Sequence, residues 1–233
     1  MQARTSVMLE VAALALAAAV FLATFRVRAS YVDFALAAAA VALIAATARR
    51  SRRLWEIASP ALAGENAARA RYRSASLLAA AFTVIALAAL AVLAFGWPPA
   101  SAADTPLLAR LFTVHLFAAM LLYFPWALLQ QYIFQFYFFG RLLHLVPVSL
   151  AVALTAVAFA SVHFPRWPVM AVTLVAGSMW SLIYYRHRTL LPLAASHAIL
   201  GAALHYWVFG HDLLADWLAL LADRFPLLAD WLR

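Results

Sequence analysis

Apolar stretches long enough to cross a bilayer follow one another along this sequence, and few charged residues interrupt them. An apolar segment of about 20 residues crosses the hydrocarbon core as a helix, because a helix satisfies its own backbone hydrogen bonds. Of the 233 residues, 68% are hydrophobic and 11% are charged. The sequence therefore predicts an all-α fold, a polytopic transmembrane helical bundle. The expected spans are Val7–Phe25, Tyr31–Thr47, Ser76–Phe95, Leu107–Tyr123, Ala127–Leu145, Val146–His163, Val169–Tyr185 and Leu190–Phe209.

The number of spans, about seven or eight, depends on the stretch Phe124-Pro125-Trp126. If the proline ends one helix, Ala127–Leu145 is a separate crossing and the bundle has about eight spans. If the proline only kinks a longer helix, one span fewer results. Loop charge favours the smaller number, because it places Arg141 inside. A polar site shared between neighbouring helices favours the larger number, and we expect eight on that ground.

Charge is concentrated in the loop 48–73, which carries Arg49, Arg50, Arg52, Arg53, Arg69, Arg71 and Arg73. Such a loop is expected on the cytoplasmic side, against anionic lipid headgroups. All 17 basic residues are arginine, the net charge is +8, and no basic soluble domain suggests a nucleic-acid partner. The lysine-free, alanine-rich composition is typical of a GC-rich bacterial genome, so the expected location is the cell (inner) membrane. With no cysteine, disulfides and thiol chemistry are excluded.

The sequence predicts three regions: N-terminal transmembrane helices (1–106), a core (107–209) and an amphipathic tail (210–233). The first apolar stretch has no convincing cleavage signature and is interpreted as a retained helix. In the tail, Leu-Leu-Ala-Asp recurs every seven residues, which places Asp216, Asp223 and Asp230 on one stripe. These short acidic pieces are expected to lie in the membrane interface. The heptad spacing also allows a homodimer seam.

Three glutamines lie inside an otherwise aromatic and aliphatic run, at Gln130, Gln131 and Gln135. Each primary amide carries two donors and an acceptor, and burying it without partners costs about 1–3 kcal/mol. The run therefore predicts a polar cavity or an interhelical hydrogen-bond cluster. His163 and His197 are the expected partners, and at least one of the first two glutamines should lie within reach of one of them.

Three stretches together resemble the CAAX protease and bacteriocin-processing (CPBP, Abi) family of intramembrane endopeptidases, related to the type 2 CAAX prenyl endopeptidase. The family pattern is Glu-Glu-x-x-x-Arg on one helix, Phe-x-x-x-His at the end of the next, and His-x-x-x-Asn on a later one. The stretch from Phe159 to His163 fits the second motif. His197, which follows a span and a short basic loop, is similar to the start of the third. The resemblance covers about residues 107–209.

The chain departs from the family at the polar positions. Gln130, Gln131 and Gln135 stand in place of the two glutamates and the arginine, and Gly201 in place of the asparagine. The resemblance implies catalytic positions at the three glutamines, His163 and His197, and substrate-binding positions at Phe159 and Gly201. In the family the first glutamate activates water, which a neutral amide cannot do because it does not accept the proton.

Three functions are open at this point. The chain is a catalytically silent relative that binds a membrane-embedded or lipidated peptide segment, or an active endopeptidase, or an unrelated small transporter or assembly factor. In the active case His163 is the base, and His197 with a glutamine donates to the oxyanion. The structural alternatives are glutamines that only join helices and an interfacial His163. His115 stands alone on an apolar helix and is interpreted as structural; no metal or other cofactor is expected.

Overall fold

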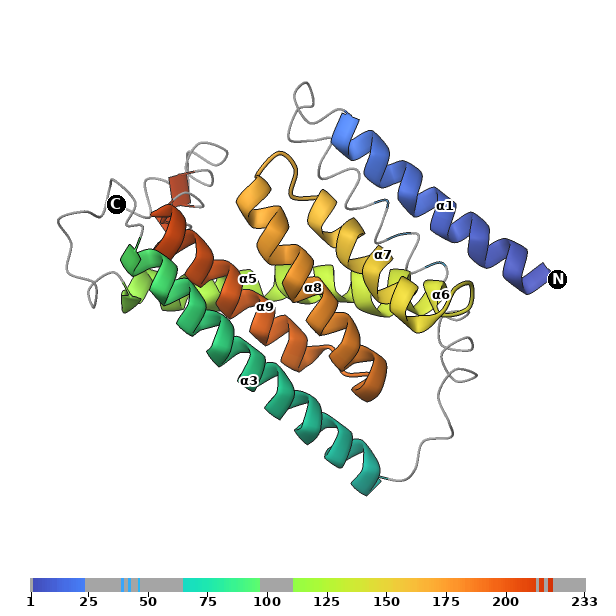
Figure 1. The fold of residues 1–233 in the computed structure, drawn as a ribbon, viewed down its shortest axis with the longest axis horizontal. Helices are drawn as coiled ribbons and strands as arrows, with labels where there is room; N and C mark the ends of the chain where they lie inside the picture. Colours follow the sequence, from blue (N-terminus) through green and yellow to red (C-terminus); the bar gives the residue numbers. More distant parts are fainter. Residues whose placement is uncertain are drawn as a thin grey trace, which may run out of the picture. The chain divides into compact units, whose positions relative to one another are not determined.

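The computed structural model describes residues 2–23, 65–96 and 111–212. It also describes the single residues Ala39, Ala42, Ala46, Leu214, Ala215, Leu218 and Ala219. In this part of the chain all regular structure is helical, which confirms the all-α prediction (Figure 1). The helices are α1 (Gln2–Ala23), α3 (Glu65–Gly96), α5 (Val114–Gln131), η2 (Tyr132–Phe139), α6 (Gly140–Leu142), α7 (Val148–Ser161), α8 (Trp167–His187), α9 (Leu191–Ala203) and η3 (Leu204–Phe209). Apart from those single residues, the second expected span and the tail repeat lie outside the described residues, as does most of the basic loop.

Three described helices are long and apolar enough to cross a membrane: Asn66–Gly96, Val114–Leu142 and Trp167–His187. Their outward-facing side chains are apolar as well, as at Ile85 and Val92 of α3, which are 70% and 71% exposed. Such a surface suits lipid rather than water. The protein is an integral membrane protein, while the expected number of seven or eight spans is not confirmed.

The glutamine stretch does not form a separate crossing. Helix α5 continues without a break through η2 into α6, with Pro125 inside α5. The expectation that the proline ends a helix is therefore wrong. In a membrane bundle neighbouring groups and local π-helical turns can satisfy the backbone groups that proline frees, so a helix can run past it. Here an eight-residue π-helix begins at Tyr132, seven positions after Pro125.

The basic loop is shorter than the expected range of 48–73. Helix α3 begins at Glu65, so Arg69, Arg71 and Arg73 lie on a helix. Alanine, arginine and glutamate are strong helix formers, and they dominate this stretch. Arginine stems can also cover apolar surface at the end of a span while the charge stays in water. The charge pattern located the polar end of the helix but not its first residue.

The chain forms two compact units that interleave in the sequence. Unit 1 is Met1–Ala75 with Gln130–Leu190, and unit 2 is Ser76–Leu129 with Leu191–Arg233. In unit 1, α7 and α8 lie side by side, as Figure 1 shows in yellow and orange. Gly177 of α8 permits this close packing: a Cβ there would lie 3.2 Å from Phe159 Cδ1. Small residues are common where membrane helices pack this closely.

The core of unit 1 is aromatic. The π-helix η2 packs on α7 and α8. Phe159 of α7 is the centre, with its ring centroid 5.0 Å from that of Phe134, 5.9 Å from that of Trp180 and 5.2 Å from that of His163. Phe159 and Trp180 are almost fully buried. Edge-to-face contacts of this kind stabilise each pair by about 0.5–1.5 kcal/mol beyond burial. They hold η2 and the end of α7 in fixed positions.

In unit 2, α9 packs beside α3 through a polar contact. Thr83 Oγ1 and Ser196 Oγ are 2.8 Å apart, and both side chains are buried. Thr83 also donates to Ala79 O at 2.7 Å. Because the Thr83 hydroxyl carries one hydrogen, it donates to one of these two oxygens at a time. The pair fixes the rotation of α9 and with it the position of the neighbouring His197.

Candidate functional site

The two glutamines at the start and middle of the π-helical run are buried in unit 1. Gln131 and Gln135 are each 1% exposed, while Gln130 is half-buried. The prediction that amides would be buried in this apolar run is confirmed for two of the three positions. π-Helical turns are rare and occur frequently at functional sites. Both features make this stretch the candidate site of unit 1.

Gln135 is held by a hydroxyl from α8. Ser181 Oγ lies 2.9 Å from Gln135 Oε1 and 2.7 Å from Gly177 O. A hydroxyl has one hydrogen, so it donates to one of these two oxygens at a time. The arrangement is an uncharged hydrogen-bond cluster between two helices. The sequence predicts histidines as partners of the glutamines, whereas Ser181 carries no local signal in the sequence that marks it as a partner.

His163 follows the end of α7, in the turn that leads to α8. Its Nδ1 lies 2.8 Å from Phe159 O. A carbonyl oxygen only accepts hydrogen bonds, so Nδ1 carries the hydrogen and Nε2 is the unprotonated nitrogen of the neutral ring. The ring also packs edge-on against Phe159. The Phe-x-x-x-His spacing therefore does two things: it orients the imidazole and it sets its tautomer.

The carboxylates available to this region are few. The sequence contains no aspartate or glutamate between Asp104 and Asp212. No carboxylate therefore lies on the continuous helix α5–η2–α6 or on α7, α8 and α9. These helices offer amides, hydroxyls and imidazoles. The Nε2 atom of His163 has the chemistry of a general base near neutral pH, as do the imidazoles of His144 and His187, but among these His163 is the one that lies in a family motif.

His197 and Gly201 belong to unit 2, where they lie one turn apart on α9. His197 is 4% exposed. Its Nε2 lies 3.5 Å from the hydroxyl oxygen of Tyr123, on α5. The structure thus brings His197, Gly201 and Tyr123 together within unit 2, and it brings Gln131, Gln135, Phe159 and His163 into unit 1. Contact of a glutamine with His163 or His197 stays a prediction.

Comparison with known proteins identifies the central segment. The family model described as "Rce1-like: Type II CAAX prenyl endopeptidase Rce1-like" matches residues 111–203. This Rce1-like domain supports membership of the CPBP family. The matched residues include all three glutamines and both histidines of the candidate motifs. Searches of curated proteins and of solved structures gave no match.

A charged cluster joins α1 to the Rce1-like segment. Arg141 Nε donates to Glu10 Oε2 at 2.8 Å, and the Tyr137 hydroxyl donates to the same oxygen at 3.1 Å. The guanidinium also lies over the Tyr137 ring, 3.6 Å from its centroid. The side chains of Arg141 and Glu10 are 3% and 11% exposed. From the sequence Arg141 has only a topological role, because its partner in this pair lies 131 positions away.

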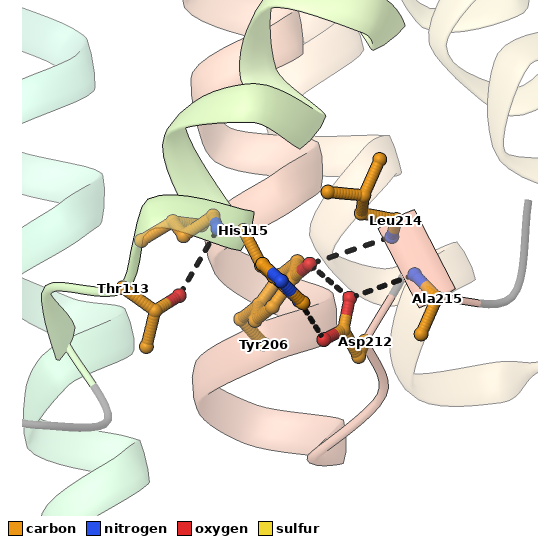
Figure 2. Close-up of polar contacts among 7 residues, drawn as sticks. Thr113, His115, Tyr206, Asp212, Leu214 and Ala215 are labelled. Atoms are coloured by element: carbon orange, nitrogen blue, oxygen red, sulfur yellow. Dashed lines mark hydrogen bonds and ion pairs between the residues drawn. The ribbon is translucent and has the colours of Figure 1, made fainter. Parts of the chain in front are cut away.

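A second polar cluster, in unit 2, lies where η3 ends (Figure 2). Asp212 accepts from His115 Nδ1 at 2.6 Å, from the Tyr206 hydroxyl and from the Ala215 N–H at 3.0 Å. His115 is therefore not a lone histidine as expected. Burial raises the pKa of Asp212, but these hydrogen bonds outweigh burial and lower the pKa below its ordinary value. In the described residues no three His, Asp or Glu side chains come together to hold a metal ion.

Proposed function

We propose that this CPBP-family protein binds a membrane-embedded or lipidated peptide segment and has impaired or altered endopeptidase activity. One observation carries the proposal: neutral amides, the half-buried Gln130 and the buried Gln131, occupy the positions where the family motif has carboxylates, and the Rce1-like segment contains no aspartate or glutamate. Family membership supports the binding of such a segment and argues against an unrelated transporter or assembly factor.

The chemistry of amides supports recognition rather than hydrolysis. A general base must take a proton from the attacking water, and a primary amide does not. An amide does offer two donors and one acceptor, which match the carbonyl and N–H groups of a peptide backbone. In a bilayer such groups need partners, because no water replaces them. Gln130, which is only half-buried, is the glutamine best suited to contact a bound segment.

Reconstituted vesicles test this proposal directly. The purified protein is incubated with a fluorescent farnesylated CAAX peptide, and both retention on the vesicles and peptide mass are followed. We expect saturable retention above protein-free vesicles and no shortening of the peptide. Gln130→Ala should weaken retention, while His211→Ala, which changes an exposed histidine outside the matched segment, should leave it unchanged.

Two results would overturn the proposal. Retention equal to that of protein-free vesicles would remove the binding function. Robust shortening of the peptide by the unmodified protein would remove the claim of impaired activity. If shortening survives His163→Ala, His163 is not the base either.

The second candidate function is an active endopeptidase with His163 as its base. The observation that favours it is the hydrogen bond from His163 Nδ1 to Phe159 O, which leaves a basic Nε2. In that case a glutamine donates to the oxyanion, and Gln130→Ala should lower the rate by about 10²-fold or more. A silent relative would show no rate to lower.

A designed variant tests whether a protease scaffold underlies the site. The combined change Gln130→Glu, Gln131→Glu, Gln135→Arg and Gly201→Asn restores the family pattern. A Cβ at Gly201 would lie 2.8 Å from Tyr123 Cε1, so the variant also needs Tyr123→Ala. The variant with all five substitutions is compared with the same variant carrying His163→Ala in addition. Cleavage by the first but not by the second would indicate that the restored residues rebuild an active site.

A further inference from the structure

In unit 2, two residues of helix α9, one polar and one small, face the same side chain of α5. His197 and Gly201 are four positions apart and so share one face of the helix. Tyr123 of α5 meets both: its ring is edge-on to the imidazole, with centroids 5.6 Å apart and planes at 89°, and its hydroxyl oxygen lies 3.5 Å from His197 Nε2. Tyr123 was not among the residues that the sequence suggested.

Gly201 makes room for this ring. A Cβ on residue 201 would lie 2.8 Å from Tyr123 Cε1 and 3.5 Å from its Cδ1. Real Cβ atoms do not approach ring carbons that closely, so any side chain at this position would displace the tyrosine. Glycine inside a helix is unfavourable by about 1 kcal/mol relative to alanine. The close approach of the Tyr123 ring is a physical reason for glycine at position 201.

We propose that Tyr123, seated against Gly201, is a positioning residue for His197. The ring sets the orientation of the imidazole, and the hydroxyl donates to Nε2. A neutral imidazole that accepts at Nε2 carries its hydrogen on Nδ1, so His197 becomes a hydrogen-bond donor at Nδ1. A donor of this kind suits a carbonyl group of a bound peptide segment. The inference rests on the proposed function only for the assignment of His197 to the binding site.

The tautomer of His197 is the direct readout. In full-length protein with ¹⁵N-labelled histidine, His197→Gln identifies the His197 signals, and their shifts report which ring nitrogen carries the hydrogen. We expect a hydrogen mainly on Nδ1 in the unmodified protein. Tyr123→Phe keeps the ring but removes the hydroxyl, and it should shift the population toward hydrogen on Nε2. Gly201→Ala should shift the same signals by displacing the ring.

Matched variants separate positioning from general disturbance. Tyr185→Phe removes an exposed tyrosine hydroxyl, and Gly140→Ala adds a Cβ where nothing lies within 4 Å. Neither should alter the His197 signals. If Gly201→Ala acts through Tyr123, its effect and that of Tyr123→Phe should be less than additive in the double variant. Unchanged His197 signals in Tyr123→Phe would overturn the inference, and that variant does not depend on tolerance of the bulkier residue at 201.

Peptide binding distinguishes this inference from the function on which it builds. Tyr123→Phe should weaken retention of the farnesylated peptide about three- to tenfold, as expected for one hydrogen bond. If the unmodified protein retains no peptide while the His197 signals still respond to Tyr123→Phe, the proposed function fails and the positioning role stands. If peptide is retained but the His197 signals do not respond, the positioning role fails alone.

Discussion

Two buried polar groups on one continuous helix are stabilised in opposite ways. Gln135 is neutral and contacts the hydroxyl of Ser181. Arg141, six positions later, is charged and pairs with Glu10 of α1. Both side chains are almost completely inaccessible to solvent. The comparison shows that unit 1 can bury a full charge where another helix supplies a counterion.

The difference bears on why the glutamines are neutral. A bilayer makes an isolated charge expensive, but the Glu10–Arg141 pair shows that the fold has a way to meet that cost. Neutrality at Gln131 and Gln135 is therefore not forced by the membrane alone. For Gln135 it reflects the partner that a neighbouring helix offers, which is the hydroxyl of Ser181 rather than a carboxylate or an arginine. This agrees with a site for recognition rather than proton transfer.

Removing the cation of the Glu10–Arg141 pair should have the largest effect on the free energy of unfolding. Arg141→Leu leaves the Glu10 carboxylate buried without its cation, and loss of one member of a buried pair costs about 3–5 kcal/mol. The free energy of unfolding in detergent micelles, followed by circular dichroism, measures this loss. Arg186→Leu, at an exposed position on α8, should change little. The double variant Glu10→Leu with Arg141→Leu should recover most of the stability, and failure to recover it would argue against the pair as the cause.

Placing a charge in the neutral half should have the next largest effect. Gln135→Glu puts a carboxylate beside Ser181 without a cation, and an ionisable group at the centre of a span costs about 2.5–3.5 kcal/mol. The same unfolding measurement applies. Gln135→Met, which removes the amide without adding charge, is the control and should cost less. If the glutamate variant is as stable as the parent at neutral pH, the contrast between the two regions is not electrostatic.

Removing the partner hydroxyl should have a small effect. Ser181→Ala deletes the contact with Gln135, and hydrogen bonds between membrane helices contribute about 0.6 kcal/mol on average. Ser178→Ala is the matched control on the same helix, because its hydroxyl donates to Leu174 O within that helix. A loss above about 2 kcal/mol for Ser181→Ala would mean that the neutral cluster is as important to stability as a charged one.

The polar cluster around Asp212 in unit 2 is partly exposed, and we expect it to have the smallest effect on stability. Its carboxylate pKa is lowered from the ordinary value of 3.8, so the folded state binds this proton less readily than the unfolded chain. The stabilisation is thus present above pH 3.8 and is lost as the pH falls through the lowered pKa. The amide signal of Ala215, which donates to Asp212, should stay constant above that pH and move below it. Asp212→Asn should abolish the transition; a transition near neutral pH would contradict the assignment.

Local patterns in the sequence predicted the local properties of this molecule. Apolar length predicted helices, and amides within an aromatic run predicted burial, which Gln131 and Gln135 confirm. The structure adds that Phe159 and His163, four positions apart at a helix end, contact each other. These predictions succeed because each depends on residues within one or two turns of each other.

Features that depend on distant segments could not be read in the same way. Glu10 with Arg141, and Tyr123 with Gly201, are pairs whose members lie on different helices far apart in the chain. Glu10 is a carboxylate inside the apolar stretch Val7–Phe25, and this is the signal in the sequence that could have led to its partner. Pro125 misled because the cost of proline in a helix depends on neighbouring groups, which a single stretch of sequence does not contain.

The π-helix η2 sets the rotation of the residues that follow it relative to the residues that precede it on the same helix. Its hydrogen bonds run from residue i to i+5 instead of i+4, so each π-helical turn holds more residues than an α-helical one. A return to α-helical bonding would turn everything after Phe139 around the axis by on the order of 100°, one residue's worth of rotation. Arg141 would then swing away from Glu10. The Glu10–Arg141 ion pair therefore stabilises the π-helical turns. Through this pair, α1 stabilises the register in which Gln135 contacts Ser181.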